Sequence, residues 1–505
     1  MIKFPMARFK ENSKKQGLFV EVDLSAQILP DTLEHTIDFM VDEKIDLSCL
    51  ESEYHNDDAG ACAYNPKDLI KIIILSFSRG FKSARDMERL CRENITFMAL
   101  SGDIRPDHAT IARFIQKFEE HLKEIFNQIL LYMDLLGLIG GEEMAIDGCK
   151  ISSNSAKDNS GTFEELDKKK EKFEKIIETI LKQSKEINED QAEIDADIDS
   201  RINKYRKKIE KIDSFLKNNK KRIGSRNKEV KSNLTDNESA KMKSSHGVIQ
   251  GYSALAAVDS KHQAIVSAMA VGTSGEATYL KEVVEDAKQN LPGKITKETT
   301  VLADTGFFCE ENCEYLINSD QKAVIPDIHF RQRDERFGRE KTGKDKNHRN
   351  PDRKRLFEHH DFDYLPEKNC YQCPAGKCLQ PDGHVWMKGN YGQRFRNKQN
   401  DCHFCYLRTK CLKKKTKNKS LFIIEIRKPK TFSEKMIDII DSTEGRKEYS
   451  KRMGIVEPVF ANITYAKKLN RFNVRGKAQV NIVWMFYCIV HNIEKIYRYG
   501  GLCKT

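Results

Sequence analysis

The stretch MAIDGCKISSNSA, residues 144–156, decides which fold class the chain belongs to. Its apolar start, Met144 to Ile146, predicts a buried strand, and Gly148 indicates the turn that ends that strand. Asp147 lies between the two. A carboxylate at the end of a buried strand is costly unless it is paired or holds a metal. An Asp-Gly pair is also the ordinary sequence of a plain turn, so Asp147 alone does not decide between turn and site.

A second aspartate stands in the same setting. The β-prone run of residues 300–303 leads to Asp304, and Gly306 and an expected helix follow. Other β-prone runs at residues 251–260, 262–271 and 322–326 alternate with a helix over residues 277–291. This alternation predicts an α/β sheet.

A third carboxylate, Glu457, lies near the end of the chain between two apolar pairs, on an expected helix. Cationic and aromatic side chains surround it in the sequence, among them Tyr449, Arg452, Lys467 and Arg475. Read alone, Glu457 fits an ion pair at the edge of the core equally well.

The whole chain of 505 residues is rich in charge and basic, with 32% DEKR, a formal net charge of +11 and a pI of about 8.8. That balance favours a polyanionic partner such as nucleic acid, although many basic proteins bind none. The N-terminus lacks the apolar core of a signal peptide, and the most apolar late run, residues 480–490, is too short to span a bilayer. We expect a soluble cytoplasmic protein with no membrane association.

The regions outside the expected sheet differ in character. Residues 1–140 predict a helical domain, either a DNA-binding domain or a helical bundle with a solvated basic face. Residues 161–242 are highly charged with a narrow apolar seam, as at Ile198, Tyr205 and Ile212, which indicates a helical, coiled-coil insertion. One long rod and a helical hairpin both fit this pattern. Its charges fit a solvated face better than a nucleic-acid site.

Residues 331–420 combine a basic loop with a cysteine cluster. Two C-x2-C pairs separated by about thirty residues can supply four thiolates to one tetrahedral zinc. The sequence predicts a structural zinc, with free thiols and a redox role as alternatives. The expected ligands, or a close permutation of them, are Cys373, Cys378, Cys402 and Cys405.

Taken together, the three carboxylates indicate metal-dependent phosphodiester chemistry. Such cleavage uses divalent ions that activate the nucleophile and stabilise the leaving oxygen. Magnesium or manganese prefers hard oxygen ligands and keeps several waters, so two or three carboxylates suffice. Asp147, Asp304 and Glu457 are therefore the predicted catalytic and metal-binding residues.

These motifs are the basis of a family resemblance. AIDGCKISSNSA, LADTGFF and the block from Tyr449 through Arg452 to IVEPVFANI resemble the DDE transposases of bacterial insertion sequences. Residues 64–114 resemble the N-terminal helical domain of one subgroup, which also carries a cysteine-bearing insertion like residues 370–411. The resemblance implies an RNase H-like core formed by residues 141–160, 243–330 and 421–505. The sequence has one residue more between Arg452 and Glu457 than the family pattern. It also has Thr464 in place of the family's lysine, and Lys467 is the nearest substitute.

The resemblance also implies the activity and the partners. The expected enzyme is a Mg²⁺- or Mn²⁺-dependent DNA transposase that cleaves the element's terminal inverted repeats and joins the exposed 3′-hydroxyl to target DNA. It would act as a homodimer or larger assembly on DNA, in the bacterial cytoplasm near the nucleoid. The expected DNA contacts are Lys150, Tyr449, Arg452, Lys467 and Arg475. The alternatives are a nuclease that cleaves without joining and a non-catalytic DNA-binding protein derived from a transposase.

Overall fold

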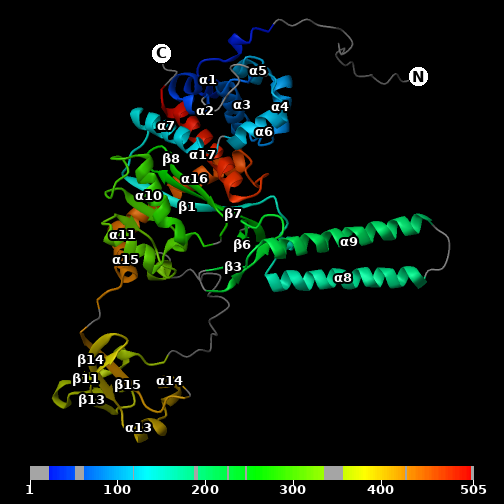
Figure 1. The fold of residues 1–505 in the computed structure, drawn as a ribbon. Coiled ribbons are helices and arrows are strands. Elements are labelled where there is room, and N and C mark those ends of the chain that lie inside the picture. Colours follow the sequence, from blue (N-terminus) through cyan, green and yellow to red (C-terminus); the bar gives the residue numbers. More distant parts are fainter. Residues whose placement is uncertain are drawn as a thin grey trace, which may run out of the picture. The chain divides into compact units, whose positions relative to one another are not determined.

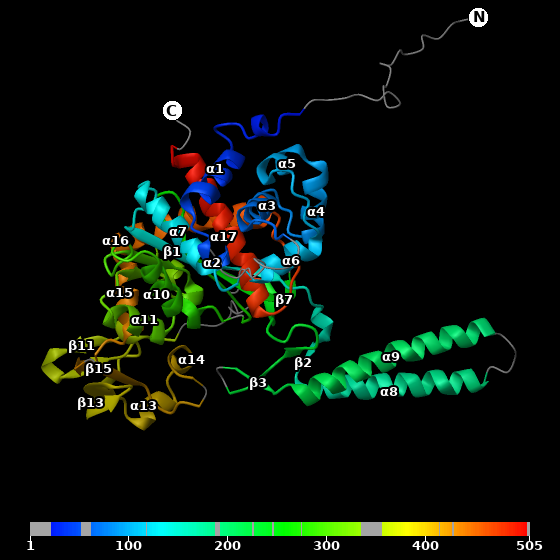
Figure 2. The same cartoon turned by 45° about the horizontal axis from the view of Figure 1, so that its top comes forward.

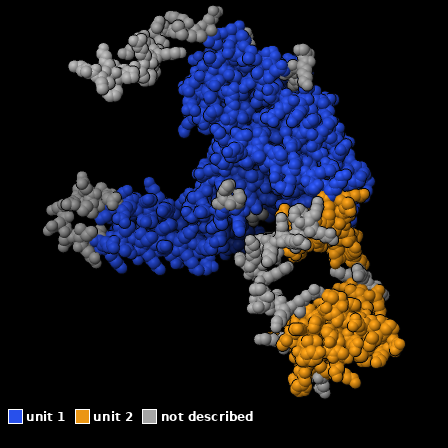
Figure 3. All heavy atoms as spheres, turned by 180° about the vertical axis from the view of Figure 1, so that it is seen from behind, with its two compact units in different colours: residues 1–307, 315–325, 447–505 blue, residues 308–314, 326–446 orange. Residues whose placement is uncertain are grey.

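A computed structural model of the chain describes residues 22–51, 62–117, 119–186, 192–224, 227–244, 247–273, 275–334, 356–413, 415–426 and 429–501. Two compact units divide the chain. Unit 1 comprises residues 1–307, 315–325 and 447–505, and unit 2 comprises residues 308–314 and 326–446 (Figure 3). Most of the predicted basic loop, residues 335–355, lies outside the described residues. No described helix is long and apolar enough to cross a membrane.

The helical character predicted for the N-terminal region is confirmed. Asn65 precedes the first residue of one helix, Pro66, and accepts a hydrogen bond from the Lys67 backbone N–H at 2.9 Å. Proline in the first helical turn sacrifices no intrahelical bond, so this start is stable. The helices are α1 (Leu33–Phe39), α2 (Ser48–Glu51), α3 (Pro66–Ser78), α4 (Ala84–Glu93), α5 (Ile95–Ser101), α6 (His108–Lys117) and α7 (Leu122–Leu135).

A mixed six-stranded sheet forms the centre of unit 1. Its strand order is β10-β9-β1-β7-β6, and β8 also pairs with β7. Strand β1 runs antiparallel to β7 and parallel to β9. The α/β class predicted from the sequence is therefore confirmed. The strands are β1 (Glu143–Ser152), β6 (Ala240–Ser244), β7 (Gly247–Asp259), β8 (Ile265–Val271), β9 (Thr300–Ala303) and β10 (Ala323–Val324), and the helices that accompany them are α10 (Leu280–Asn290), α11 (Glu310–Asn318), α16 (Thr443–Ala461) and α17 (Lys477–Tyr499).

The turn predicted at Gly148 is wrong, because β1 continues through this residue and Gly148 pairs with Leu255 of β7. The glycine is required for space. A Cβ atom at this position would lie 2.7 Å from Leu255 Cδ2 and 2.9 Å from Glu276 Cδ. Gly148 thus lets two side chains approach the strand beside Asp147.

Helix α17 joins the N-terminal helices to the sheet, as Figures 1 and 2 both show. Toward α3, Phe77 stacks on Phe486 with ring centroids 5.4 Å apart. Toward β8, Asn492 accepts from the Ile265 backbone N–H and donates to its carbonyl, each at 2.9 Å. Asn481 pairs with Ala270 in the same way. The two asparagines therefore satisfy backbone groups of β8 that would otherwise be buried without partners.

The charged insertion is a helical hairpin, one of the two forms predicted. Helices α8 (Phe163–Glu186) and α9 (Ala192–Asn218) lie side by side (Figure 1). Phe173 contacts Tyr205 across them, with ring centroids 5.6 Å apart. Where the hairpin begins and ends, Leu166, Ile212 and Phe215 form a small buried cluster. Short strands accompany it: β2 (Ser160–Gly161) pairs with β5 (Ser232–Asn233), and β3 (Arg222–Ile223) pairs with β4 (Glu229–Val230).

Unit 2 contains a five-stranded antiparallel sheet, ordered β11-β12-β13-β14-β15. Its buried cluster consists of four side chains, Phe362, Leu379, Phe395 and Leu421. The elements of unit 2 are α12 (Phe330–Arg333), β11 (Asp363–Leu365), β12 (Cys370–Gln372), β13 (Cys378–Met387), β14 (Asn390–Arg396), α13 (Gln399–His403), α14 (Arg408–Cys411), β15 (Ser420–Ile426) and α15 (Phe432–Asp441).

Candidate metal centre

Strand register brings Asp147 and Asp304 together. Ile146 of β1 is the parallel partner of Ala303 of β9, and each aspartate is the next residue along its strand. Neighbouring strands lie about 4.8 Å apart, so the two aspartates start from adjacent backbone positions where β9 ends, although β1 continues to Ser152. The Asp304 charge acts directly on Asp147.

A third carboxylate, Glu276, reaches the same place from the loop after β8. It precedes a short 3-10 helix, Ala277–Tyr279, that leads into α10. Ser253 donates a hydrogen bond to Glu276 Oε1. The other oxygen, Oε2, would be 3.0 Å from a Cβ atom at Gly148. The absence of a side chain at Gly148 therefore allows Glu276 to lie against the strand that carries Asp147.

Arg452 of α16 completes the cluster. Its Nη1 atom lies 3.0 Å from Asp147 Oδ2, and the Arg452 side chain is 11% exposed. Asp147 Oδ1 accepts the Gly148 backbone N–H at 2.8 Å, and Asp304 Oδ1 accepts that of Gly306 at 2.8 Å. Arg452 Nε is buried and has no hydrogen-bond partner in the described part of the chain.

The electrostatics of the cluster favour a bound cation. Burial raises the pKa of Asp147, and the Asp304 charge raises it further, whereas Arg452 and the Gly148 amide lower it. Burial also raises the pKa of Glu276. The charges of Asp147 and Asp304 raise this pKa further, whereas the hydrogen bond from Ser253 and the charge of Lys150 lower it. Carboxylates that are buried and repel one another hold protons more tightly until a cation neutralises them. Asp147, Asp304 and Glu276 offer the oxygen ligands that a hard divalent ion such as Mg²⁺ prefers. Their oxygens do not all lie within 4.8 Å of one another, so binding of one ion by all three would require side-chain movement.

Glu457, the predicted third carboxylate, lies elsewhere on α16. It is exposed, and it follows Arg452 by five residues. Five residues turn an α-helix through about 500°, which leaves Glu457 about 140° around the axis from Arg452. Tyr449, in contrast, is near enough to Arg452 for the two to interact electrostatically. The structure therefore groups Asp147, Asp304, Arg452 and Tyr449, and it sets Glu457 apart from them.

The remaining predicted DNA contacts divide into two kinds. Lys150 and Arg475 are exposed, and Arg475 Nε donates to the Asn154 carbonyl at 2.8 Å. Lys467 is buried, and its Nζ lies 2.6 Å from Glu494 Oε2. An ammonium group in this position serves an internal ion pair and does not face DNA.

Sequence reasoning missed Glu276. An acidic residue at the start of a helix is common, because it interacts favourably with the helix N-terminus, and Glu276 has that ordinary position. Its setting differs from that of Asp147 and Asp304: those aspartates directly follow a β-prone run and precede a glycine, whereas Glu276 comes five residues after Val271, behind two glycines.

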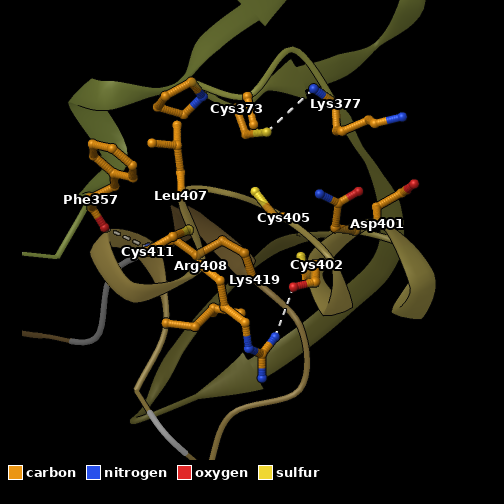
Figure 4. Close-up of a pocket in the computed structure, with 14 residues that line it drawn as sticks. Phe357, Cys373, Lys377, Asp401, Cys402, Cys405, Leu407, Arg408, Cys411 and Lys419 are labelled. Carbon is orange, nitrogen blue, oxygen red and sulfur yellow. Dashed lines mark hydrogen bonds between the residues drawn. The ribbon is translucent and has the colours of Figure 1, made fainter.

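The six cysteines between residues 370 and 411 separate into two groups. Cys373, Cys402, Cys405 and Cys411 line one small pocket (Figure 4). Cys370 and Cys378 form a hydrogen-bonded thiol pair of their own. Three of the four predicted zinc ligands therefore lie at the pocket, with Cys411 in the place expected for Cys378. In unit 1, Cys49, His121 and Glu124 also bring ligand atoms within 4.8 Å of one another.

Two aspartates on adjacent strands, a third, partly buried carboxylate and an arginine paired with one of them define a candidate divalent-metal site on a mixed α/β sheet. The comparisons with known families agree with this class. The family model described as "Transposase DDE domain" matches residues 372–497, and the model described as "Transposase domain (DUF772)" matches residues 22–117. Neither a curated protein nor a solved structure matches the chain.

These two matches confirm the resemblance to DDE transposases of insertion sequences. The matched regions contain Arg452, Glu457 and helices α1–α6, whereas Asp147 and Asp304 lie outside them. The families imply a role in transposition, an RNase H-like fold, DNA binding and the use of a divalent metal.

Proposed function

We propose that the chain is a DNA transposase whose active site is built around Asp147 and Asp304. It would cleave a phosphodiester at the ends of its element to expose a 3′-hydroxyl, and then transfer that hydroxyl to target DNA. The observation that carries this proposal is the pairing of Ile146 with Ala303, because it brings the two aspartates that follow them to adjacent positions. The family matches indicate that the reaction at this site is part of transposition.

The residues of the site have separable roles in this proposal. Asp147 and Asp304 would hold Mg²⁺ or Mn²⁺, which would activate the attacking oxygen and stabilise the leaving oxygen. Arg452 orients Asp147 through Nη1. Lys150 and Arg475, both exposed, add positive charge for the DNA backbone. Tyr449 lies beside Arg452 and helps to position DNA there.

Two glutamates compete for the third carboxylate position. The sequence motif assigns it to Glu457, whereas the geometry favours Glu276, which lies beside Asp147. Matched Glu276→Gln and Glu457→Gln variants separate these assignments, because the true ligand loses both Mn²⁺ affinity and strand cleavage when its charge is removed.

We also propose how the regions divide the work. Residues 1–140 would recognise the terminal inverted repeats, and residues 141–160, 243–330 and 421–505 would carry the chemistry. The hairpin within residues 161–242 and the module within residues 331–420 would be insertions. Because two element ends must be joined, two or more copies of the chain would assemble on DNA.

The experiment that tests the function uses Asp147→Asn. This variant keeps the size of the side chain and removes its charge, so DNA binding is expected to persist while Mg²⁺-dependent strand cleavage is lost. Normal cleavage by a folded Asp147→Asn protein would refute the assignment. Supplying pre-cut 3′ ends distinguishes a transposase from a nuclease, because only a transposase joins them to target DNA.

A further inference from the structure

We propose that Cys373, Cys402, Cys405 and Cys411 together bind one structural Zn²⁺ ion, and that Cys370 and Cys378 lie outside this site. The zinc would hold together the β-module of unit 2, residues 356–426. The proposal concerns a place in the fold that the proposed DNA chemistry does not use, so it stands independently of that function.

The four cysteines come from two separate segments of the chain, the end of β12 and residues 402–411. Cys373 follows strand β12, Cys402 lies on α13, Cys405 lies between α13 and α14, and Cys411 ends α14. Their side chains point toward a common space in Figure 4. Cys373, Cys402 and Cys405 are also near enough to Cys411 to act on it electrostatically. Three thiols from residues 402–411 and one from residue 373 that line the same pocket provide the full ligand set of a tetrahedral zinc site.

The size of the pocket fits a single ion. About 20 Å³ is open to the centre of a water-sized sphere, and the lining is mostly apolar apart from the thiols and a few charged groups. That volume has room for about one water or one ion. The Cys373 sulfur accepts a hydrogen bond from the Lys377 backbone N–H at 3.3 Å, a contact that stabilises a thiolate.

Charge around the pocket suits a zinc tetrathiolate. When four thiols bind Zn²⁺ they release four protons to solvent, and the resulting centre carries a charge of about −2. Three basic residues, Lys377, Arg408 and Lys419, line the pocket, and Arg408 donates to the Cys402 carbonyl at 2.9 Å. The acidic residue Asp401 also lines it. Three cations against one anion partly offset the charge of the centre.

A bound zinc ion would stabilise the β-module, because the hydrophobic core of the module is small. The buried cluster holds four side chains, and the helices that bear cysteines, α13 and α14, have five and four residues and no side-chain N-cap. Helices this short are unstable by themselves. Small domains with few buried side chains commonly depend on a structural metal or on disulfides.

The four sulfurs stand further apart than they would in a loaded site. Among the described residues, the group found with three ligand atoms within 4.8 Å of one another is Cys49, His121 and Glu124. No three of the four sulfurs at the pocket therefore lie that close together. Sulfurs at about 2.3 Å from one tetrahedral zinc lie about 3.8 Å from one another. Zinc binding therefore requires rotation of cysteine side chains and a slight closure of the pocket.

The first test measures metal content in the full-length protein, purified under reducing conditions with zinc present and then dialysed. We expect one tightly bound zinc per wild-type chain and a loss of that zinc in Cys411→Ser. Two controls should keep it: Cys378→Ser, which alters the thiol pair outside the site, and Cys49→Ser, which alters the group in unit 1. Wild-type protein without zinc, or zinc that is lost in either control and kept in Cys411→Ser, would overturn the proposal.

A second test needs no substitution, so it remains decisive if Cys411→Ser fails to fold. Wild-type protein is alkylated with and without a strong chelator, and each cysteine is quantified by peptide mass spectrometry. Cys373, Cys402, Cys405 and Cys411 should become reactive on chelation, whereas Cys378 should react equally in both samples. Equal labelling of the four with and without chelator, or disulfides among them in the untreated protein, would contradict the assignment. Neither readout depends on strand cleavage.

Discussion

Substituting Gly148 by alanine tests how the candidate metal centre is packed. The added Cβ atom would lie 2.7 Å from Leu255 Cδ2 and 2.9 Å from Glu276 Cδ, whereas carbon atoms in favourable contact are about 3.5–4.0 Å apart. Leu255 is fully buried and paired with Gly148 across the sheet, so it has little room to move. Glu276 must therefore shift. We expect overpacking to cost about 1–3 kcal/mol, with a fall in Tm of roughly 2–6 °C.

The functional consequence of Gly148→Ala follows from the displaced carboxylate. Mn²⁺ affinity, measured by titration calorimetry on the folded variant, should fall ~10–100-fold, as for other losses of support around a metal. Gly454→Ala is the matched control, because nothing lies within 4 Å of a Cβ atom at Gly454 and its backbone is helical. Wild-type stability and Mn²⁺ affinity in Gly148→Ala would refute the packing described around Asp147.

Two further predictions concern pH and the edge of the sheet. Burial, together with Asp147 and Asp304, raises the pKa of Glu276 in the folded state, so without metal its contribution to stability is present at low pH and is lost as pH rises through that pKa. In EDTA, melting curves should show that the Tm of Glu276→Gln rises relative to that of wild type as pH rises. In saturating Mn²⁺, wild type should instead be the more stable protein. Parallel plots of Tm against pH for the two proteins in EDTA would contradict this. Asn492→Leu should cost ~2–6 kcal/mol in chemical unfolding, because it leaves the Ile265 N–H and carbonyl unpaired. The exposed Asn473→Ala serves as its control, and equal midpoints for the two variants would show that α17 does not satisfy β8.

Much of the core could be predicted from local sequence. An apolar run that ends in aspartate predicts a strand-end carboxylate. The structure has one at Asp304, whereas Asp147 lies within β1, which continues to Ser152. The register that makes them neighbours could not be predicted, because strand order depends on contacts between distant segments. Gly148 was misjudged for a related reason. A glycine is read locally as a turn, whereas here it leaves room for Leu255 and Glu276, which approach from other parts of the chain.

The same limit applies to the side chains around these aspartates. The motif indicates Glu457, but the face of α16 on which a residue lies depends on how the helix is rotated against β1. The cysteine spacing predicts a metal site without saying which thiols meet. Cys411 replaces Cys378 at the pocket because the folding of α13 and α14 brings the end of α14 near Cys373.

The central claim is that Asp147 and Asp304 form a metal-dependent DNA-cleaving site. The most direct measurement is cleavage of end-labelled DNA that carries the inverted repeats flanking the coding region, by wild type and by Asp304→Asn. Wild type should release a 3′-hydroxyl end in Mg²⁺ and none in EDTA. Asp304→Asn should bind the same DNA and leave it intact. Equal cleavage by the folded variant, or cleavage by wild type in EDTA, would contradict the claim.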